Sequence, residues 1–329
     1  MSLFAASARL VCFGKLPSHG DFVRNGTAST SLVQTLDRWM SRTLELLAQD
    51  PRWKQVYDEA PATQFAFLGP RSPVGLAGHL VPSQDASGRR YPFIAAASFG
   101  VSEPAGFLGL SPLALSRLWT QMEHTAQRAQ DCANATQTQD VLASAERQLE
   151  SPVAPNATHF QDFLRTQTLG SLEALFEEAG QALPLRQALL ALGLLLRPLL
   201  GQPSPRLERG LQLPLPNDPL YRPFVASFWL DLVAGFLRRS ALELGIFTTR
   251  HRGRGLLIVG FNGACPRSLR SVLAPQDNLQ DNIEFSCPSW VERSVETDYG
   301  LKKLSSYLRD PMLSLAQAGQ TFRETFLGL

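Results

Sequence analysis

The chain has 329 residues, of which 44% are hydrophobic, and its formal net charge is +2 at pH 7. This length fits two domains or one elaborated domain with a full apolar core. The near-neutral charge balance gives no overall electrostatic reason for a nucleic-acid or membrane partner. The longest apolar run, Ala188 to Leu196, is far shorter than the roughly 20 residues of a membrane span.

The N-terminus and the cysteines indicate the cellular compartment. Met1 to Leu10 lacks the basic n-region and the continuous apolar h-region of a signal peptide, so we expect a cytoplasmic protein. The cysteines are widely spaced, with no C-x-x-C pair and no histidine at ligand spacing. This pattern favours reduced, mostly buried thiols over disulfides or a zinc site. The residues concerned are Cys12, Cys132, Cys265 and Cys287.

The chain opens with a buried strand that runs into a polar turn. Leu10 to Phe13 is apolar, the pattern breaks at Gly14, and it resumes at Phe22 and Val23, which we expect to be buried. The intervening residues are polar or turn-forming. A turn held between two buried anchors is suited to binding.

Helices and short strands follow in the rest of the first half. Residues 32–47 have one apolar helical face, with N-cap candidates at 29–31, and a second short helix contains Trp53 and Tyr57. Residues 65–68, 75–81 and 92–99 have strand patterns, and Pro82 to Arg90 is a long hairpin loop. Ser111-Pro112 predicts a helix start, and residues 124–149 predict an exposed helix tail or a linker.

The second half is predicted to be rich in helices, with a domain boundary at residues 151–156 that separates 1–150 from 151–329. Residues 202–219 predict an extended connector, and residues 245–261 predict a strand pair with a basic tip. The predicted fold class is α+β: an N-terminal mixed or antiparallel sheet flanked by helices, and a helix-rich C-terminal half that carries this short strand pair. Helices are predicted at 160–164, 172–179, 185–196, 221–237, 266–273 and within 301–327.

Several motifs of the first 99 residues resemble the TagF (ImpM) family, accessory proteins of bacterial type VI secretion. The opening segment reads F-G-K-L-P-S-H-G-D-F-V-R, and His19 stands where the family usually has arginine. The resemblance continues through Leu36 to Trp39, Trp53, Ala60-Pro61 and Phe65 to Phe67, then through Gly78 to Asp85 and Gly88 to Pro92.

This resemblance implies a cytoplasmic accessory and regulatory protein of a type VI secretion system that acts by binding rather than catalysis. Family members are associated with post-translational repression of secretion, and with a forkhead-associated scaffold protein as partner. We expect the same partner here. The oligomeric state is not indicated by the sequence.

The family motifs include both the opening turn and the long hairpin loop, and we expect these two segments to converge on one face. Within that face, Arg89 is expected to pair with Asp21 or with an acidic group of the partner. A solvated basic tip is the simpler interpretation of the predicted hairpin end, and an acidic or phosphorylated partner is the other. The candidate partner-binding residues are Lys15, Ser18, His19, Asp21, Ser83, Asp85, Arg89, Arg250, Arg252 and Arg254.

An enzyme is the alternative, as a hydrolase or phosphatase that uses the Ser18-His19-Asp21 turn. Nucleophilic catalysis needs a base that reaches the serine oxygen, and we expect adjacent side chains to diverge along an extended backbone. No P-loop, no G-x-G-x-x-G turn and no H-x-H pair is present, so we predict no cofactor and no metal. A third interpretation is a structural component of the secretion machine.

Overall fold

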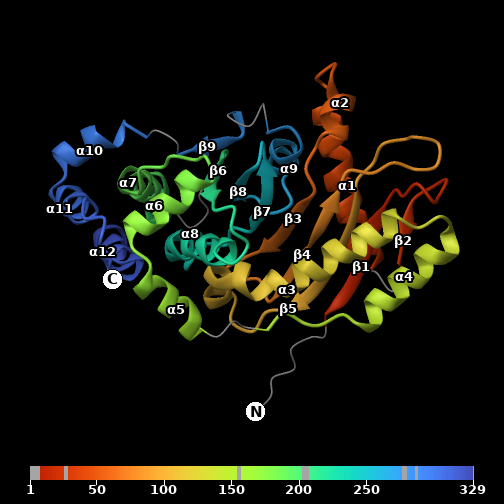
Figure 1. Cartoon of the computed structure of the whole chain (residues 1–329), viewed down its shortest axis with the longest axis horizontal. Coiled ribbons are helices and arrows are strands. Elements are labelled where there is room, and N and C mark those ends of the chain that lie inside the picture. The colour runs from red at the N-terminus through yellow and green to blue at the C-terminus, as the bar shows by residue number, and fades with distance from the viewer. Residues whose placement is uncertain are drawn as a thin grey trace, which may run out of the picture.

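The computed structural model describes residues 8–25, 29–153, 157–201, 207–275, 280–285 and 288–328. Within them one nine-stranded sheet runs through the molecule in the order β2-β1-β5-β4-β3-β7-β8-β6-β9 (Figure 1). Neighbouring strands are antiparallel except β6 and β9, which are parallel. The strands are β1 Arg9–Gly14, β2 Val23–Arg24, β3 Thr63–Leu68, β4 Val74–Val81, β5 Phe93–Gly100, β6 Gly210–Leu215, β7 Leu244–His251, β8 Arg254–Gly260 and β9 Asn282–Glu284.

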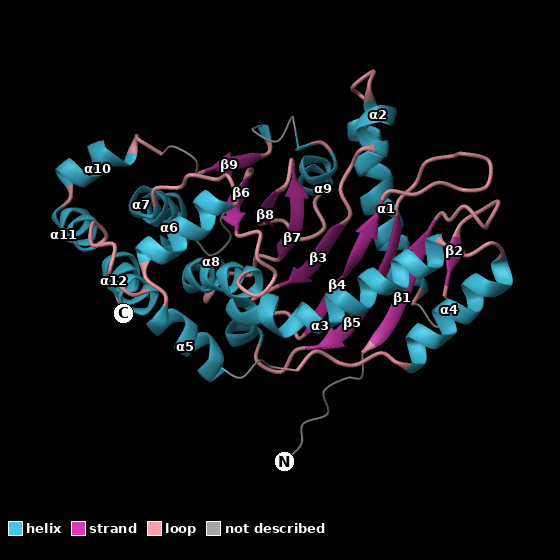
Figure 2. Cartoon of the chain, in the orientation of Figure 1, coloured by secondary structure: helices cyan, strands magenta, loops and turns pink. Residues whose placement is uncertain are grey.

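Helices pack on both faces of the sheet, so the predicted α+β class is confirmed (Figure 2). Apolar side chains of α1 and α9 form a core with one face, and those of α3 and α8 form a larger core with the other. The helices of the first half are α1 Thr30–Leu47, α2 Trp53–Asp58, α3 Pro104–Gln130 and α4 Ala135–Arg147. Those of the second half are α5 Ala157–Thr166, α6 Leu169–Glu178, α7 Leu185–Leu196, α8 Arg222–Leu237, α9 Pro266–Leu273, α10 Val291–Thr297, α11 Tyr299–Tyr307 and α12 Leu315–Leu327, with a 3-10 turn at Arg197–Gly201.

The predicted helix start at Ser111-Pro112 is wrong, because both residues lie inside α3. A proline has no N–H to donate to the carbonyl four residues earlier, which here belongs to Leu108. The Ser111 hydroxyl donates to that carbonyl instead, at 2.8 Å. The helix therefore continues through the proline. The sequence pattern alone does not reveal that a serine hydroxyl replaces the missing backbone donor.

Two segments, one predicted as an exposed helix tail or a linker and the other as an extended connector, form a separate helix and a strand. Residues 135–147 form α4, which is capped by the side chain of Asn134, and residues 210–215 of the predicted connector form β6. The sequence pattern did not predict this strand because it contains Pro214, and proline cannot donate a hydrogen bond to a neighbouring strand. It lies beyond Gly210–Gln212, the part of β6 that pairs with β9, and its carbonyl accepts a hydrogen bond from the Trp229 indole at 3.1 Å. Residues 202–206 of the predicted connector lie outside the described residues.

The predicted strand pair is present as β7 and β8, and it belongs to the same sheet as the N-terminal strands. Phe65 of β3 pairs directly with Phe247 of β7. The sheet is thus continuous across the predicted boundary near residue 150, part of which (154–156) lies outside the described residues, and the two-domain division stays a prediction.

The described cysteines are free thiols, with Cys12 buried and Cys132 and Cys265 half-buried, whereas Cys287 lies outside the described residues. Burial raises the pKa of the Cys12 thiol far above its usual range. None of the helices in the described ranges combines the length and apolar character needed to cross a membrane.

Candidate functional site

The opening turn and the long hairpin loop lie side by side at the same end of the strands. Gly14, the last residue of β1, pairs with Phe93 at the start of β5, and Phe93 also pairs with Val81 at the end of β4. Residues 15–22 and 82–92 therefore begin from neighbouring strands. The Ala86 amide donates to the His19 carbonyl at 2.8 Å, so the predicted convergence of the two segments is confirmed. We call this surface the two-loop face and define it as residues 15–22 and 82–91.

The Asp85 carboxylate holds the two-loop face together. Its side chain is fully buried and ion-pairs with the Lys15 ammonium at 3.0 Å. Its Oδ1 accepts from the Ser87 amide, the Ser87 hydroxyl and the Arg89 amide, and its Oδ2 also accepts from Arg89 Nε at 2.7 Å. Burial by itself would raise the pKa of Asp85, but the hydrogen bonds from Ser87, Arg89 and Lys15 outweigh it and hold the pKa well below its usual range.

The expected pairing of Arg89 with Asp21 is wrong. Arg89 pairs with Asp85 inside its own loop, and its Nη2 donates to the Gly20 carbonyl at 2.6 Å. Asp21 is exposed and its Oδ1 accepts from the Phe22 amide at 2.8 Å. The turn of the hairpin loop places the Asp85 carboxylate beside Arg89. The Arg89 guanidinium therefore pairs with this local carboxylate and not with Asp21 of the opening turn.

Ser18 and His19 do not diverge as expected, because the backbone is a tight turn there, with the His19 amide bonded to the Leu16 carbonyl at 3.0 Å. The Ser18 hydroxyl lies 3.0 Å from His19 Nδ1 and 3.1 Å from the Thr138 hydroxyl on α4. This hydroxyl therefore ties the turn to the neighbouring helix as well as to the imidazole.

Phe22 is the exposed aromatic residue of the two-loop face. The sequence pattern predicted a buried anchor, but the residue is 44% exposed, whereas Val23 is buried as predicted. Its ring stacks on Phe13 at 5.3 Å between centroids and meets the Tyr91 ring edge-on at 4.8 Å. The Lys15 ammonium lies 5.2 Å from the Phe22 centroid. The ring is thus held rigidly with one side open to solvent.

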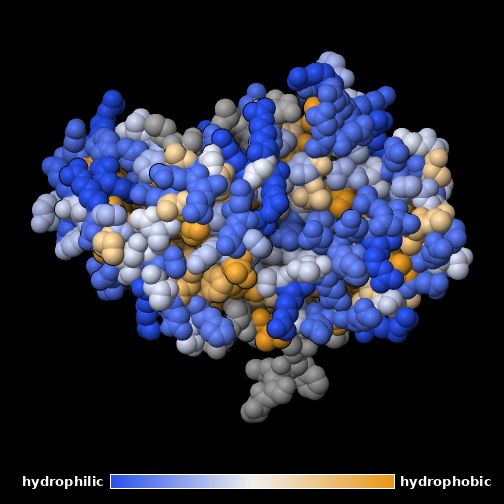
Figure 3. All heavy atoms as spheres, in the orientation of Figure 1, coloured by the Kyte–Doolittle hydropathy of each residue, from blue (hydrophilic) through white to orange (hydrophobic). Residues whose placement is uncertain are grey.

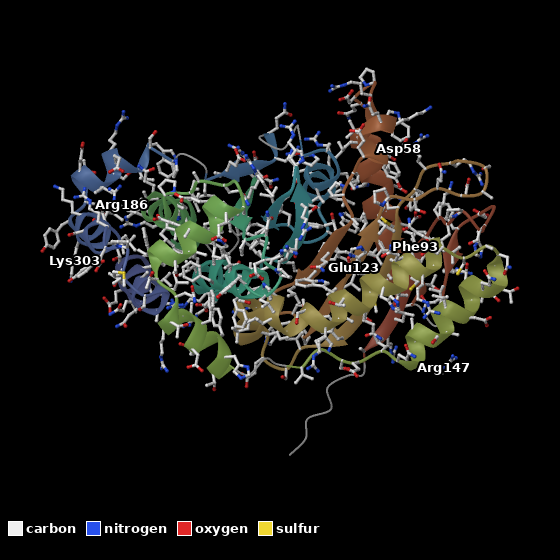
Figure 4. The ribbon with its side chains drawn as sticks, viewed as in Figure 1. Asp58, Phe93, Glu123, Arg147, Arg186 and Lys303 are labelled. Atoms are coloured by element: carbon white, nitrogen blue, oxygen red, sulfur yellow. The ribbon has the colours of Figure 1, made fainter. Side chains whose placement is uncertain are left out.

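Ser83 shapes the two-loop face from below rather than lining it. It is buried, and its backbone amide and carbonyl both bond to the Tyr57 hydroxyl of α2, at 2.9 and 3.0 Å. Beside it Arg90 forms two hydrogen bonds with Asp58 at the end of α2 (Figure 4), each 2.7 Å long. The base of the hairpin loop is therefore anchored to the body of the protein.

The basic tip lies at the same sheet edge but on different strands. Arg252 (φ 50°) and Gly253 (φ 79°) form the two-residue turn between β7 and β8, and both backbones are left-handed as that turn requires. Arg250, Arg252 and Arg254 are all exposed. In the strand order, β3 lies between β7 and β4, the nearest strand that carries the two-loop face, so the tip is not part of that face.

A pocket beside Arg250 contains residues that sequence reasoning missed. Its volume is about 420 Å³ and it lies at the sheet edge between α3 and α8. The signal in the sequence was a histidine inside a buried strand, His79 of β4, but its polar neighbours come from other segments. We call it the polar pocket and define it by Pro61, Ala62, Gln64, His79, Glu123, Arg222, Thr248, Thr249 and Arg250.

Comparison with known proteins assigns a family to the first part of the chain. Residues 11–145 match the model of the TagF N-terminal domain, type VI secretion system-associated, so the resemblance is confirmed over that range. No curated protein matches the chain. Among solved structures, the chain is similar to the crystal structure of PA0076 from Pseudomonas aeruginosa PAO1, with 24% identity and a TM-score of 0.37. That similarity covers 45% of this chain and 65% of PA0076, slightly less than two thirds of its length.

Proposed function

We propose that this chain, whose residues 11–145 match the model of the type VI secretion-associated TagF N-terminal domain, is a cytoplasmic regulator that acts by binding another protein. The resemblance implies post-translational repression through a forkhead-associated scaffold protein, and we propose that scaffold as the partner. The observation that carries the proposal is the two-loop face, in which an exposed aromatic ring is fixed on a rigid, hydrogen-bonded base.

The two-loop face has the properties of a preformed binding surface. Its loops are ordered by the Asp85 interactions and by the Tyr57 anchor, so little conformational entropy is lost on binding. Aromatic residues, phenylalanine included, are enriched at protein interfaces, and Phe22 is an exposed aromatic residue of this face. Arg89, whose side chain is 60% exposed, and the exposed Asp21 add charges at the rim.

A hydrolase is the second candidate, favoured by the 3.0 Å contact between the Ser18 hydroxyl and His19 Nδ1. A catalytic pair also needs a group that orients the base. The nearest acidic residue in sequence, Asp21, bonds with Oδ1 to the Phe22 amide, and Ser18 also contacts Thr138. These contacts favour a turn-stabilising role. Turnover of a p-nitrophenyl ester or phosphate by the purified chain, lost in Ser18→Ala, would support the hydrolase.

Capture of the partner tests the proposal. The purified full chain is used as bait in an extract of a bacterium that carries the type VI system, together with a Phe22→Ala variant. We expect the wild type to recover the forkhead-associated scaffold and the variant to recover on the order of tenfold less, because a central aromatic anchor is lost.

Tyr299→Ala is the matched control, since Tyr299 is an even more exposed aromatic residue, on α11 at the opposite end of the molecule (Figure 1). Thermal unfolding of both variants shows whether each remains folded. Equal recovery by Phe22→Ala and the wild type would contradict the proposed surface. Stable co-assembly with sheath or baseplate proteins would instead favour the structural-component interpretation.

A further inference from the structure

A row of polar side chains crosses three neighbouring strands at the floor of the polar pocket. Gln64 of β3 pairs directly with His79 of β4 on one side and with Thr248 of β7 on the other. The next row on the same face is apolar and belongs to the core, as expected for a sheet face covered by helices. It consists of Ala66, Ala77 and Ile246. Three polar residues in one row of this face therefore require an explanation other than packing.

Two of these side chains are buried without a hydrogen bond. His79 is 4% exposed and Thr248 is 9% exposed, yet His79 Nδ1 and Thr248 Oγ1 have no partner among the described residues. A buried polar atom without a partner costs about 1–3 kcal/mol, and such atoms are rare in native proteins. Because both residues line the pocket, a molecule bound there would supply the missing partners.

Positive charge surrounds the same space. Arg250 of β7 has no ion pair or hydrogen bond from its side chain within the described ranges. Arg222, the first residue of α8, donates from Nε to the Pro216 carbonyl at 3.3 Å and from Nη2 to the Asn217 carbonyl at 2.7 Å. These bonds hold the guanidinium in place, and the positive end of the α8 dipole lies beside it.

The two arginines are close enough to affect each other. Burial lowers the pKa of Arg222, and the charge of Arg250 lowers it further, so the like charges repel across the pocket. Burial also lowers the pKa of His79, while Glu123 on α3 acts in the opposite direction (Figure 4). The imidazole is therefore neutral near pH 7 and has both a donor and an acceptor nitrogen.

We propose that the polar pocket binds a small molecule through a phosphate group, which Arg250, Arg222 and Thr248 would hold against the floor formed by Gln64 and His79. Guanidinium groups from two different elements, a hydroxyl and an amide present donors from several directions, which suits a tetrahedral oxyanion better than a planar carboxylate. A binding site of this kind is independent of the two-loop face and goes beyond partner binding.

The size and the remaining lining restrict the ligand further. About 420 Å³ falls in the range of small-molecule pockets and exceeds what phosphate alone would fill. Glu123, a carboxylate in the lining, would accept hydrogen bonds from hydroxyl or amino groups of the ligand and would disfavour a second anionic group beside it. The fitting class is thus a phosphate monoester with hydroxyl or amino donors. Figure 3 shows that hydrophilic residues cover much of the face presented in that view.

Calorimetric titration of the full chain tests this proposal, with inorganic phosphate, O-phosphoethanolamine and succinate as the three probes. We expect O-phosphoethanolamine, a phosphate monoester with an amino group and no carboxylate, to bind more tightly than phosphate, and succinate to bind more weakly than both. Arg250→Gln should weaken phosphate binding by roughly tenfold or more, because a charge-assisted hydrogen bond is lost. Arg254→Gln is the matched control. It also removes a positive charge from the hairpin tip, but Arg254 lines a different pocket, so the affinity for phosphate should be unchanged.

Thr248→Val provides a second variant that does not depend on charge. It replaces a buried, unpartnered hydroxyl by a methyl group, so the free protein should be at least as stable as the wild type while phosphate binding weakens. The His79 ring resonances in proton NMR, assigned with a His79→Gln variant, should shift on phosphate addition. The proposal is overturned if no phosphate probe binds, if succinate binds most tightly, or if Arg250→Gln and Thr248→Val bind phosphate as the wild type does.

Discussion

Replacing Gly14 by alanine is expected to lower the free energy of unfolding by about 3 kcal/mol or more. Gly14 ends β1 with a φ of 135°, a backbone conformation that L-residues with a side chain rarely adopt. A Cβ added there would also lie 2.7 Å from Phe93 Cα and still closer to the Pro92 carbonyl oxygen. The obstacle is backbone on the paired strand, which cannot move without breaking the ladder between β1 and β5.

Gly20→Ala is the matched control, because Gly20 lies in the same turn with no atom within 4 Å of the added Cβ and no positive φ. We expect it to change the unfolding free energy by less than about 0.5 kcal/mol. Urea denaturation of the two variants measures the difference. Similar stabilities for Gly14→Ala and Gly20→Ala would contradict the close approach of Gly14 to the backbone of Pro92 and Phe93.

Replacing Asp85 by asparagine is expected to lower the melting temperature by roughly 5 to 10 °C. Asparagine keeps the size and the Oδ1 acceptor, but it removes the charge opposite Lys15 and directs an amide at donors from Lys15 and Arg89. The Lys15 side chain is only 9% exposed, so its ammonium would be left buried and unpaired. Asp21→Asn, in the exposed part of the turn, should have little effect on the melting temperature.

A double variant separates the lost charge from other consequences. Lys15→Met combined with Asp85→Asn removes both charges, so it should be more stable than Asp85→Asn alone if the unpaired ammonium is the cause. Thermal unfolding of the wild type and of the single and double variants completes the cycle. A double variant less stable than either single variant would contradict this explanation.

The same interaction predicts a pH dependence. The pKa of Asp85 is lower in the folded chain than in the unfolded chain, where an aspartate titrates near pH 4 (about 3.9). Its contribution to stability is therefore fully present above about pH 4 and is lost as the pH falls below that value towards the folded pKa. Between pH 4 and pH 2, the wild type should lose more stability than Asp85→Asn does.

Regular elements of this fold were predictable where the apolar period was uninterrupted. The predicted helix α1 is confirmed, and its buried face follows the helical period. The predicted helix α8 and the strands β7 and β8 are also present, but they are buried on nearly all sides, as expected for elements at the centre of a sheet covered by helices. Predictions failed where a single side chain compensates for a local rule. The Ser111 hydroxyl replaces the missing N–H of Pro112, and Pro214 lies beyond the part of β6 that pairs with β9.

The sequence predicted which two segments form the candidate site, but not the contacts between their side chains. The family motifs indicated that the opening turn and the hairpin loop converge on one face, and the two segments are in contact in the structure. The partner of Arg89 and the exposure of Phe22 depend on the shape of each loop. The polar pocket was not predictable, because its floor exists only once β4, β3 and β7 are placed in register.

Amide hydrogen exchange of the full chain, with and without the captured scaffold, tests the central claim most directly. The two-loop face should gain protection at residues 15–22 and 82–91 when the partner binds, while the exchange of α11 and α12 should stay unchanged. Protection confined to the C-terminal helices, or no change at the two loops in a saturated complex, would show that the partner binds elsewhere.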